Sequence, residues 1–301
     1  MKILVVGGSG FIGRALIEAL ARKGHEVESW DRIAGPSVGE TRFRPVDLLG
    51  EAPLPSPEGP PWEAAFHLAA YSVPGMSWST DLVLANLRMT ARVLDHLAQT
   101  AAGCRTIYAS SAFVYQPSPR LLTEEAPTGS GHPYALSKLL GESWALSLAD
   151  RLDIRIVRPF NLIGPGMAKG LLVPDLLERI RSGDTRLAMR GRDDVRDFLD
   201  WRDAVEAYCR MATAPAPSGT VWNLCSGRPT AVSSLVAALL RAHGRDLPVS
   251  FAEPPAIPMV GSPERLMDAT GWQPRRSLEE TAADLVADRS GGTVPQPPPH
   301  G

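Results

Sequence analysis

Cysteine is scarce in this sequence, and the few cysteines present have no paired spacing. Among 301 residues there are three, Cys104, Cys209 and Cys225. An odd number of widely separated cysteines excludes a disulfide-stapled secreted scaffold, so we expect reduced core thiols in a cytoplasmic protein. The six histidines also lack the spacing to cysteines or carboxylates that a zinc site needs, and we therefore expect no metal.

Long apolar runs and a strong excess of either charge are also missing. No segment approaches the roughly 20 apolar residues that span a bilayer, and no signal peptide precedes the first apolar run. The net charge of −2 and the pI near 6.3 exclude the basic surface that nucleic-acid-binding proteins present. These absences leave a small molecule as the expected partner, with neither a nucleic acid nor a membrane involved.

Glycine, by contrast, is placed with regular spacing near the N-terminus. The apolar run 2–6 predicts a parallel strand buried on both faces, and an amphipathic helical pattern covers 11–22. Between them Gly7, Gly10 and Gly13 have the spacing of a turn that brings a dinucleotide pyrophosphate close to the backbone at a helix N-terminus. We therefore expect cofactor contacts from Gly7, Gly10, Phe11, Ile12 and Gly13.

The next predicted strand, 26–30, is followed by an acidic residue, Asp31, 18 residues after Gly13. An acidic side chain at this place accepts hydrogen bonds from the adenosine ribose and repels a 2′-phosphate, which favours NAD over NADP. The neighbouring Arg32 keeps NADP open, because a guanidinium can bind a 2′-phosphate.

Tyr134 and Lys138 lie four residues apart in a helical pattern, so the two side chains share one face of the helix. A free phenol has a pKa near 10, and a cation one turn away favours the phenolate. This pattern predicts a general base. The alternative is a surface helix with a packed tyrosine and a solvated lysine.

Together these motifs resemble the extended short-chain dehydrogenase/reductase family, in particular its NAD-dependent epimerase/dehydratase group. The resemblance runs from residue 1 to about residue 285. It includes further segments in the family's order, at 47–48, 67–70, 109–115, 158–166, 196–203, 222–224 and 271–274.

The resemblance implies a site and a substrate class. The catalytic residues would be Ser111, Tyr134 and Lys138, and the substrate would be a nucleotide sugar. Further implied cofactor contacts are Asp47, Leu48, Leu68, Ala69, Ala70, Asn86, Tyr134, Lys138 and Pro159. Implied substrate contacts are Ser72, Ser111, Asn161, Val173 and Arg196.

Alternating strand and helix patterns predict an α/β fold with a doubly wound parallel (Rossmann) sheet and a smaller C-terminal substrate-binding lobe. The NAD(P)-binding domain would comprise 1–165 and 219–227, and the lobe 166–218 and 228–289. The Gly/Pro-rich tail 290–301 is expected to be disordered. Predicted strands cover 2–6, 26–30, 42–46, 64–68, 104–109 and 154–158, and predicted helices 11–22, 80–100 and 132–150.

Two departures from the family pattern narrow the function. Ala112 and Phe113 stand where family dehydratases have an Asp-Glu pair, and eliminating water needs such an added acid and base, so a dehydratase is disfavoured. The segment 253–258 lacks the arginine with which many sugar-nucleotide enzymes clamp the diphosphate. Arg196 remains as one clamp, and a second would come from Arg190, Arg192 or Arg265.

Three functions remain. The first is an epimerase acting at C4 of a nucleoside-diphosphate sugar, with tightly held NAD as a transient hydride acceptor. The second is a keto-sugar reductase that consumes NAD(P)H. The third is a dinucleotide-sensing regulatory protein, which the presence of both Tyr134 and Lys138 disfavours.

The predicted helices 80–100 and 132–150 carry more leucine than one sheet-facing stripe requires. In the family such helices commonly pair about a twofold axis, so we expect a homodimer. The alternative is that both helices are buried within the monomer.

Overall fold

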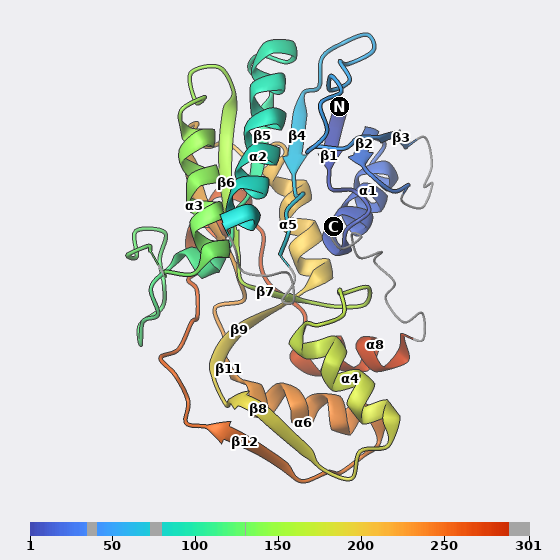
Figure 1. Cartoon of the computed structure of the whole chain (residues 1–301), viewed down its shortest axis with the longest axis vertical. Helices are drawn as coiled ribbons and strands as arrows, with labels where there is room; N and C mark the ends of the chain where they lie inside the picture. The colour runs from blue at the N-terminus through green and yellow to red at the C-terminus, as the bar shows by residue number, and fades with distance from the viewer. Residues whose placement is uncertain (35–40, 73–79, 130, 289–301) are drawn as a thin grey trace.

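A computed structural model describes residues 1–34, 41–72, 80–129 and 131–288, with a large parallel sheet at one end and a smaller lobe at the other (Figure 1). The seven strands of the large sheet lie in the order β10-β6-β5-β4-β1-β2-β3. Their bounds are β1 (Lys2–Val6), β2 (Glu26–Asp31), β3 (Arg42–Pro45), β4 (Ala64–His67), β5 (Arg105–Ala109), β6 (Asp153–Pro159) and β10 (Thr220–Leu224).

The alternation of side chains along β1 explains why helices cover both faces of this sheet. Ile3 and Val5 belong to the core beneath α1 (Phe11–Arg22) and α5 (Trp201–Met211). Leu4 and Val6 belong to the core on the opposite face, beneath α2 (Thr80–Thr100). All four side chains are fully buried, and each contributes roughly 1.5–3 kcal/mol of stability. Because its side chains are apolar on both faces, β1 has to lie in the interior of the sheet and be covered by helices on both sides.

The order of the strands indicates where a ligand would bind. Strand β1 pairs with β2 on one side and β4 on the other, so the strand order reverses next to β1. In open α/β sheets ligands bind at the carboxyl ends of the strands at such a reversal. The 3₁₀ helix η1 (Ala112–Val114) and α3 (Pro133–Leu146), which packs on α2, follow β5 at this edge. The predicted fold class is confirmed.

The lobe is built from two small sheets and three helices. Strands β7 (Asn161–Ile163), β9 (Val195–Asp200) and β11 (Pro229–Ala231) form one sheet, and β8 (Leu187–Arg192) pairs with β12 (Val249–Glu253) in the other. Helices α4 (Leu172–Ser182), α6 (Val232–His243) and α8 (Leu278–Ala287) enclose the lobe's own apolar core. This core is separate from the two that cover the large sheet.

Some elements depart from the predicted boundaries. Helix α5 and Leu266 of α7 (Glu264–Thr270) belong to the core under the large sheet, although the predicted division assigns 166–218 and 228–289 to the lobe. We therefore propose that both helices are part of the dinucleotide-binding domain. Helix α3 ends at Leu146 instead of residue 150, where the hydroxyl of Ser147 donates to the Trp144 carbonyl. The tail 290–301 lies outside the described residues.

The described residues bear on membrane insertion, metal binding and disulfide bonding. None of the described helices is long and apolar enough to cross a bilayer. No cluster of three or more His, Cys, Asp or Glu side chains with metal-binding geometry occurs in the described ranges. The three cysteines are buried free thiols.

Candidate active site

The glycine-rich turn after β1 is shaped by close backbone contacts. Gly7 has a φ of +91°, and a Cβ there would come within 2.7 Å of the Ala69 nitrogen. A Cβ on Gly13 would come within 2.2 Å of the Gly7 carbonyl oxygen. Gly10 is less crowded, with its nearest neighbour, the Gly7 oxygen, 3.3 Å from the ideal Cβ. Gly7 and Gly13 are therefore required by the turn itself, whereas Gly10 leaves open space beside the backbone.

Helix α1 begins at this turn, with Gly10 as its N-cap, and no side chain caps it. The first N–H groups of an α-helix have no intrahelical partner, and its N-terminus carries partial positive charge. Phe11 and Ile12 lie in this first turn. The turn thus offers what a dinucleotide pyrophosphate requires, namely free backbone donors and no side chain in the way.

Asp31 lies at the end of β2 beside the turn, and backbone groups hold its carboxylate in place. One oxygen accepts a hydrogen bond from the Ser9 N–H at 3.0 Å, and the other accepts one from the Arg32 N–H at 2.7 Å. The exposed Arg32 places its guanidinium 6.0 Å from the centre of the Tyr71 ring. An acidic group is therefore fixed where an adenosine ribose is expected, with a cation next to it.

Ser111 follows β5 and caps η1, where its Oγ accepts a hydrogen bond from the Phe113 N–H at 3.2 Å. Because the oxygen is the acceptor there, the hydroxyl proton can be donated to a second partner. Ser111 and Tyr134 share a hydrogen bond, and the ring of Phe113 stands edge-on to the ring of Tyr134 at 6.3 Å. The structure thus brings the two predicted catalytic hydroxyls together.

Lys138 joins them from the next turn of α3. This helix begins at Pro133, whose fixed φ suits a first helical position, so Tyr134 lies in the first turn. The Lys138 ammonium is 5.9 Å from the centre of the Tyr134 ring and donates to the Ala109 carbonyl at 2.7 Å. Its side chain is buried, which lowers the pKa of Lys138 to about 8, while the Glu142 carboxylate acts to raise it.

The pKa of Tyr134 differs from the sequence prediction. Burial raises the pKa of Tyr134 to about 12, and the hydrogen bond with Ser111 is the interaction that opposes this rise. Lys138 does not outweigh it, because its ammonium is directed to the Ala109 carbonyl. A further positive charge at the site would lower the pKa of Tyr134 and increase the fraction of phenolate at neutral pH.

Segments after β3 and β4 complete the dinucleotide side. Leu68, Ala69 and Ala70 directly follow β4, and the Leu68 N–H donates to the Val6 carbonyl. Asp47 is exposed and caps the Leu49 N–H, whereas the Leu48 side chain lies in the core. Their backbone, together with Pro159 at the end of β6, is what this edge offers to a ligand.

Asn86 has a different environment from the other predicted cofactor contacts. Its amide accepts from the Tyr71 N–H at 2.8 Å and donates to the Tyr71 carbonyl and to the Ser137 hydroxyl. The side chain is 3% exposed. We therefore propose that Asn86 braces the loop after β4 against α3 and that its contribution to cofactor binding is indirect.

The predicted substrate contacts are spread over the two parts of the molecule. Ser72 is exposed beyond β4, and Asn161 at the start of β7 donates to the Asp197 carbonyl at 2.8 Å. Arg196 on β9 is half-exposed and pairs with Asp194 at 3.3 Å. Val173 is packed into the lobe core, so its side chain is not available to a ligand. Arg196 and Asn161 stay candidates for substrate contacts.

The second phosphate clamp is less well supported. Arg192 is paired with Glu253 at 2.8 Å. Arg265 pairs with Glu124 and Glu125 and lines a groove of about 620 Å³ with Trp222, on the side of the edge strand β10. A diphosphate would have to displace these carboxylates from either guanidinium. The side chain of Arg190 lies outside the described part of the chain.

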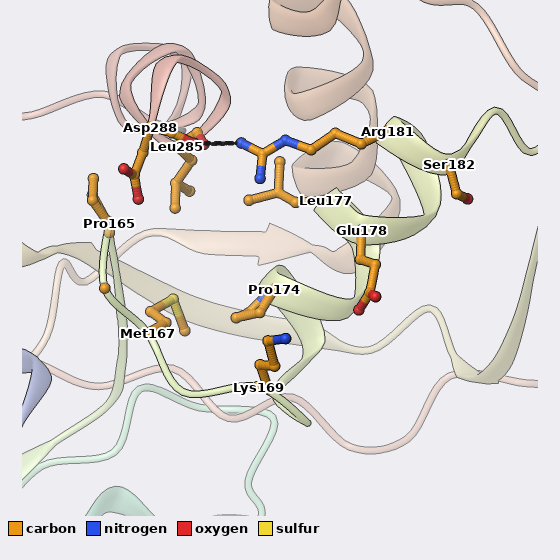
Figure 2. Close-up of a pocket in the computed structure, with 12 residues that line it drawn as sticks. Pro165, Met167, Lys169, Pro174, Leu177, Glu178, Arg181, Ser182, Leu285 and Asp288 are labelled. Atoms are coloured by element: carbon orange, nitrogen blue, oxygen red, sulfur yellow. Dashed lines mark hydrogen bonds between the residues drawn. The ribbon is translucent and has the colours of Figure 1, made fainter. Parts of the chain in front are cut away.

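Figure 2 shows a cavity of about 420 Å³ between the 164–169 loop, α4 and α8. Pro165, Met167, Leu177 and Leu285 give it apolar walls, and Arg181 donates to the Asp288 carbonyl at 2.6 Å on its far side. None of Ser111, Tyr134 and Lys138 lines this cavity. It belongs to the lobe and is distinct from the candidate catalytic groups.

Two features of the site escaped the sequence analysis. Arg92 on α2 donates to the carbonyls of Asp47, Leu48, Gly50 and Ala52 and thereby holds the loop after β3. Glu142 on α3 forms a buried ion pair with Arg158 behind the catalytic groups. The i,i+4 spacing of Lys138 and Glu142 indicates that these two residues are neighbours on one helix, but no local spacing indicates the pairing of Glu142 with Arg158.

Comparison with known proteins places these features in context. The family model described as NAD dependent epimerase/dehydratase family matches residues 3–225. A structure of RMD from Pseudomonas aeruginosa complexed with NADPH superimposes with a TM-score of 0.80 at 27% identity, covering 95% of this chain and 98% of that one.

Curated relatives differ in their named reactions. A GDP-6-deoxy-D-mannose reductase of Pseudomonas aeruginosa is 29% identical, over 95% of this chain and 96% of the relative. A UDP-glucose 4-epimerase of Mycolicibacterium smegmatis is 28% identical, over 95% and 97%. A 2-alkyl-3-oxoalkanoate reductase of Stenotrophomonas maltophilia is 33% identical, over 83% and 79%. Similarity at this level does not separate epimerases from reductases.

Proposed function

The chain belongs to the NAD dependent epimerase/dehydratase family, and we propose that it is an epimerase that inverts C4 of a nucleoside-diphosphate sugar with NAD as its cofactor. It is an NAD-dependent epimerase or oxidoreductase of the extended short-chain dehydrogenase/reductase type. The choice of reaction, cofactor and substrate within that class is our proposal.

The dinucleotide side of the site fits NAD. The turn at Gly7, Gly10 and Gly13 and the uncapped start of α1 suit a pyrophosphate, and Asp31 suits the ribose hydroxyls. When bound, NAD supplies a nicotinamide ring that can take up and return a hydride. Lys138 and Tyr134 are the side chains of this chain that would hold the neighbouring ribose.

The chemistry required of the protein is proton transfer at a secondary alcohol. Tyr134 takes the hydroxyl proton as the alcohol becomes a ketone and returns it when the alcohol re-forms. Ser111 donates its hydroxyl proton to the reacting oxygen when substrate is bound and orients that oxygen, a role worth roughly 10²–10³ in rate by analogy with other positioned donors. The positive charge of Lys138 stabilises the phenolate.

Asp31 is the observation that carries the choice of NAD as the cofactor, and the choice of an epimerase over a reductase rests on retention of that cofactor. Its carboxylate is fixed by two backbone N–H groups at the ribose position, where it disfavours a 2′-phosphate. NAD selection agrees better with a cofactor that is retained and recycled than with one that is consumed as NADPH. Ala112 and Phe113 in place of an acid–base pair argue against elimination.

A reductase is the second candidate, and specific observations favour it. Arg32 is exposed beside Asp31 and suits a 2′-phosphate. The segment 253–258 supplies no arginine for a diphosphate, and one relative is named as a reductase of an oxoalkanoate. A keto-sugar or another keto substrate reduced by NAD(P)H is therefore the alternative.

Identification of the retained dinucleotide tests the proposal. The purified protein is denatured, and the released dinucleotide is identified together with its oxidation state. An epimerase that recycles its cofactor should release NAD in near-stoichiometric amount. Release of no dinucleotide, combined with stoichiometric NAD(P)H oxidation on a keto substrate, would establish the reductase instead.

A further inference from the structure

Glu142 is a buried carboxylate that the proposed reaction does not use. It lies on α3 one turn beyond Lys138 and is 5% exposed. Its carboxylate accepts two hydrogen bonds from Arg158, from Nε at 2.9 Å and from Nη2 at 2.6 Å. A buried charge pair costs desolvation energy and is tolerated where its geometry is good, as in this two-point contact.

The same carboxylate holds the end of strand β5. Oε1 of Glu142 accepts a hydrogen bond from the hydroxyl of Ser110, the residue directly before Ser111. Lys138 donates to the carbonyl of Ala109, one residue earlier. Two successive residues of the strand end are thus bound to successive turns of α3, which fixes the position of Ser111 relative to Tyr134.

Arg158 is itself held on its other side. Its guanidinium lies 4.8 Å from the centre of the Tyr115 ring and donates to the Glu124 carbonyl at 3.2 Å. The Tyr115 hydroxyl donates to Asn223 at 2.7 Å. The pair is therefore anchored to the loop after η1 and to β10, and Glu142 has little freedom to leave Ser110.

The charge of Lys138 has few other partners in its surroundings. It faces the rings of Tyr108 at 5.2 Å and Tyr134 at 5.9 Å. His67 on β4 is buried and uncharged, with a pKa lowered to about 3 by burial and, to a smaller extent, by Lys138. Glu142 is the carboxylate that acts on the ammonium, and it opposes the effect of burial.

We propose that Glu142, paired with Arg158, is a positioning residue of the site: it fixes the strand end that carries Ser111 and balances the buried charge of Lys138. This role deepens the proposed function and rests on it for its catalytic meaning. Its electrostatic part can be measured without any substrate.

The first experiment follows Lys138 directly. The chain has four lysines, Lys2, Lys23, Lys138 and Lys169, so ¹³C-labelled lysine gives few NMR signals, and a Lys138→Met variant assigns one of them. In the wild type that signal should titrate near pH 8. Glu142→Gln should lower the midpoint by about one pH unit or more, because the carboxylate no longer favours the ammonium.

Asp153→Asn is the matched control, since Asp153 pairs with the fully buried Arg155 at the other end of the same strand β6. It should leave the Lys138 midpoint unchanged. If Glu142→Gln does not fold, Glu142→Gln combined with Arg158→Gln removes both charges and should still lower the midpoint. A midpoint equal to the wild-type value in a folded Glu142 variant overturns the proposal.

The second experiment concerns turnover. Glu142→Gln should move the alkaline limb of the pH profile of kcat to lower pH, in step with the Lys138 midpoint. A uniform loss of kcat at every pH would indicate a merely structural role and contradict the proposal. If no epimerase activity exists but the Lys138 midpoint shifts as expected, the proposed function fails and the electrostatic role of Glu142 stands.

Discussion

The carboxylate of Asp31 and the backbone N–H of Ser9 are joined by a hydrogen bond of 3.0 Å, which fixes the end of β2 against the glycine-rich turn. The residue that we propose to select the dinucleotide is thereby held by the segment that we propose to bind its phosphates. We therefore expect cofactor selectivity and phosphate binding to be coupled through this contact and to be separable by mutation.

Asp31→Asn keeps an oxygen that can accept from Ser9 but removes the charge. We expect wild-type protein to bind NAD(H) more tightly than NADP(H). Asp31→Asn should reduce this difference in affinity, because the repulsion of a 2′-phosphate is lost. Calorimetric titration with each dinucleotide measures the ratio of the two dissociation constants. Glu26→Gln, at the exposed amino end of the same strand, is the control for net charge. Tighter NADPH binding by the wild type would contradict the assignment.

Gly10 and Gly13 should respond differently to alanine. A Cβ on Gly13 would overlap the Gly7 carbonyl, so Gly13→Ala should destabilise the fold by roughly 1–3 kcal/mol. Gly10→Ala has more room and should leave the free energy of unfolding almost unchanged while weakening NAD binding at least tenfold, because a methyl group then faces the pyrophosphate. Urea unfolding and dinucleotide titration on both variants check this. If Gly10→Ala and Gly13→Ala lowered the free energy of unfolding equally, the proposed difference between the two glycines would be wrong.

Tyr134→Phe removes the proposed base. Turnover should fall at least 10²-fold with NAD affinity nearly unchanged, because the phenol hydroxyl moves the proton and is not the main dinucleotide contact. Turnover within threefold of the wild type would remove Tyr134 from the mechanism.

The pKa of the same phenol gives a pH prediction. Burial places it at about 12 in the protein alone, so the phenolate is nearly absent at neutral pH. Loading dinucleotide-free protein with NAD⁺ should lower this pKa, because a positive charge favours the phenolate. Ultraviolet difference titration of wild type against Tyr134→Phe isolates this tyrosine, and an unchanged or higher pKa with NAD⁺ would show that Lys138 and the cofactor do not activate it.

The homodimer stays a prediction, and α3 supplies a surface for it. Leu136, Leu140 and Trp144 recur every four residues and form one stripe, with 49%, 36% and 40% of their surfaces exposed. Light scattering at micromolar concentration should give twice the 32.3 kDa chain mass. Leu140→Lys should shift the mass toward the monomer, whereas Ile257→Lys, at an apolar residue that is more exposed but lies outside α3, should not. A monomeric wild type would defeat this prediction without affecting the site.

The large sheet and the family could be predicted from the sequence because their signals are local. An unbroken apolar strand, a glycine turn and a Tyr-x-x-x-Lys spacing each act over a few residues, and the family assignment and fold class are confirmed. The position of residues 201–211 in the chain predicts a helix of the lobe, and we propose its transfer to the dinucleotide-binding domain because it packs beside α1. No local pattern indicates which face of which sheet an amphipathic helix will cover.

The members of the candidate site stay a prediction from the sequence, whereas its electrostatics could not be predicted from the sequence at all. Tyr134 and Lys138 follow from helix periodicity, and Ser111 from its motif. The burial that raises the pKa of Tyr134, and the pairing of Glu142 with Arg158, depend on contacts between α3, β5 and β6. Such desolvation is a property of the assembled core, and spacing along the chain does not report it.

The central claim is that a hydrogen of the substrate leaves C4 and returns to it within one active site. Incubation of the wild-type enzyme with UDP-glucose deuterated at C4 tests this most directly, with mass spectrometry and NMR of the sugar product. We predict formation of the C4 epimer with the deuterium retained at C4 and no net change in external NAD(H). Transfer of the deuterium to external NAD(P)⁺ with a keto-sugar as the product, or loss of the deuterium from C4 to solvent, would contradict the account.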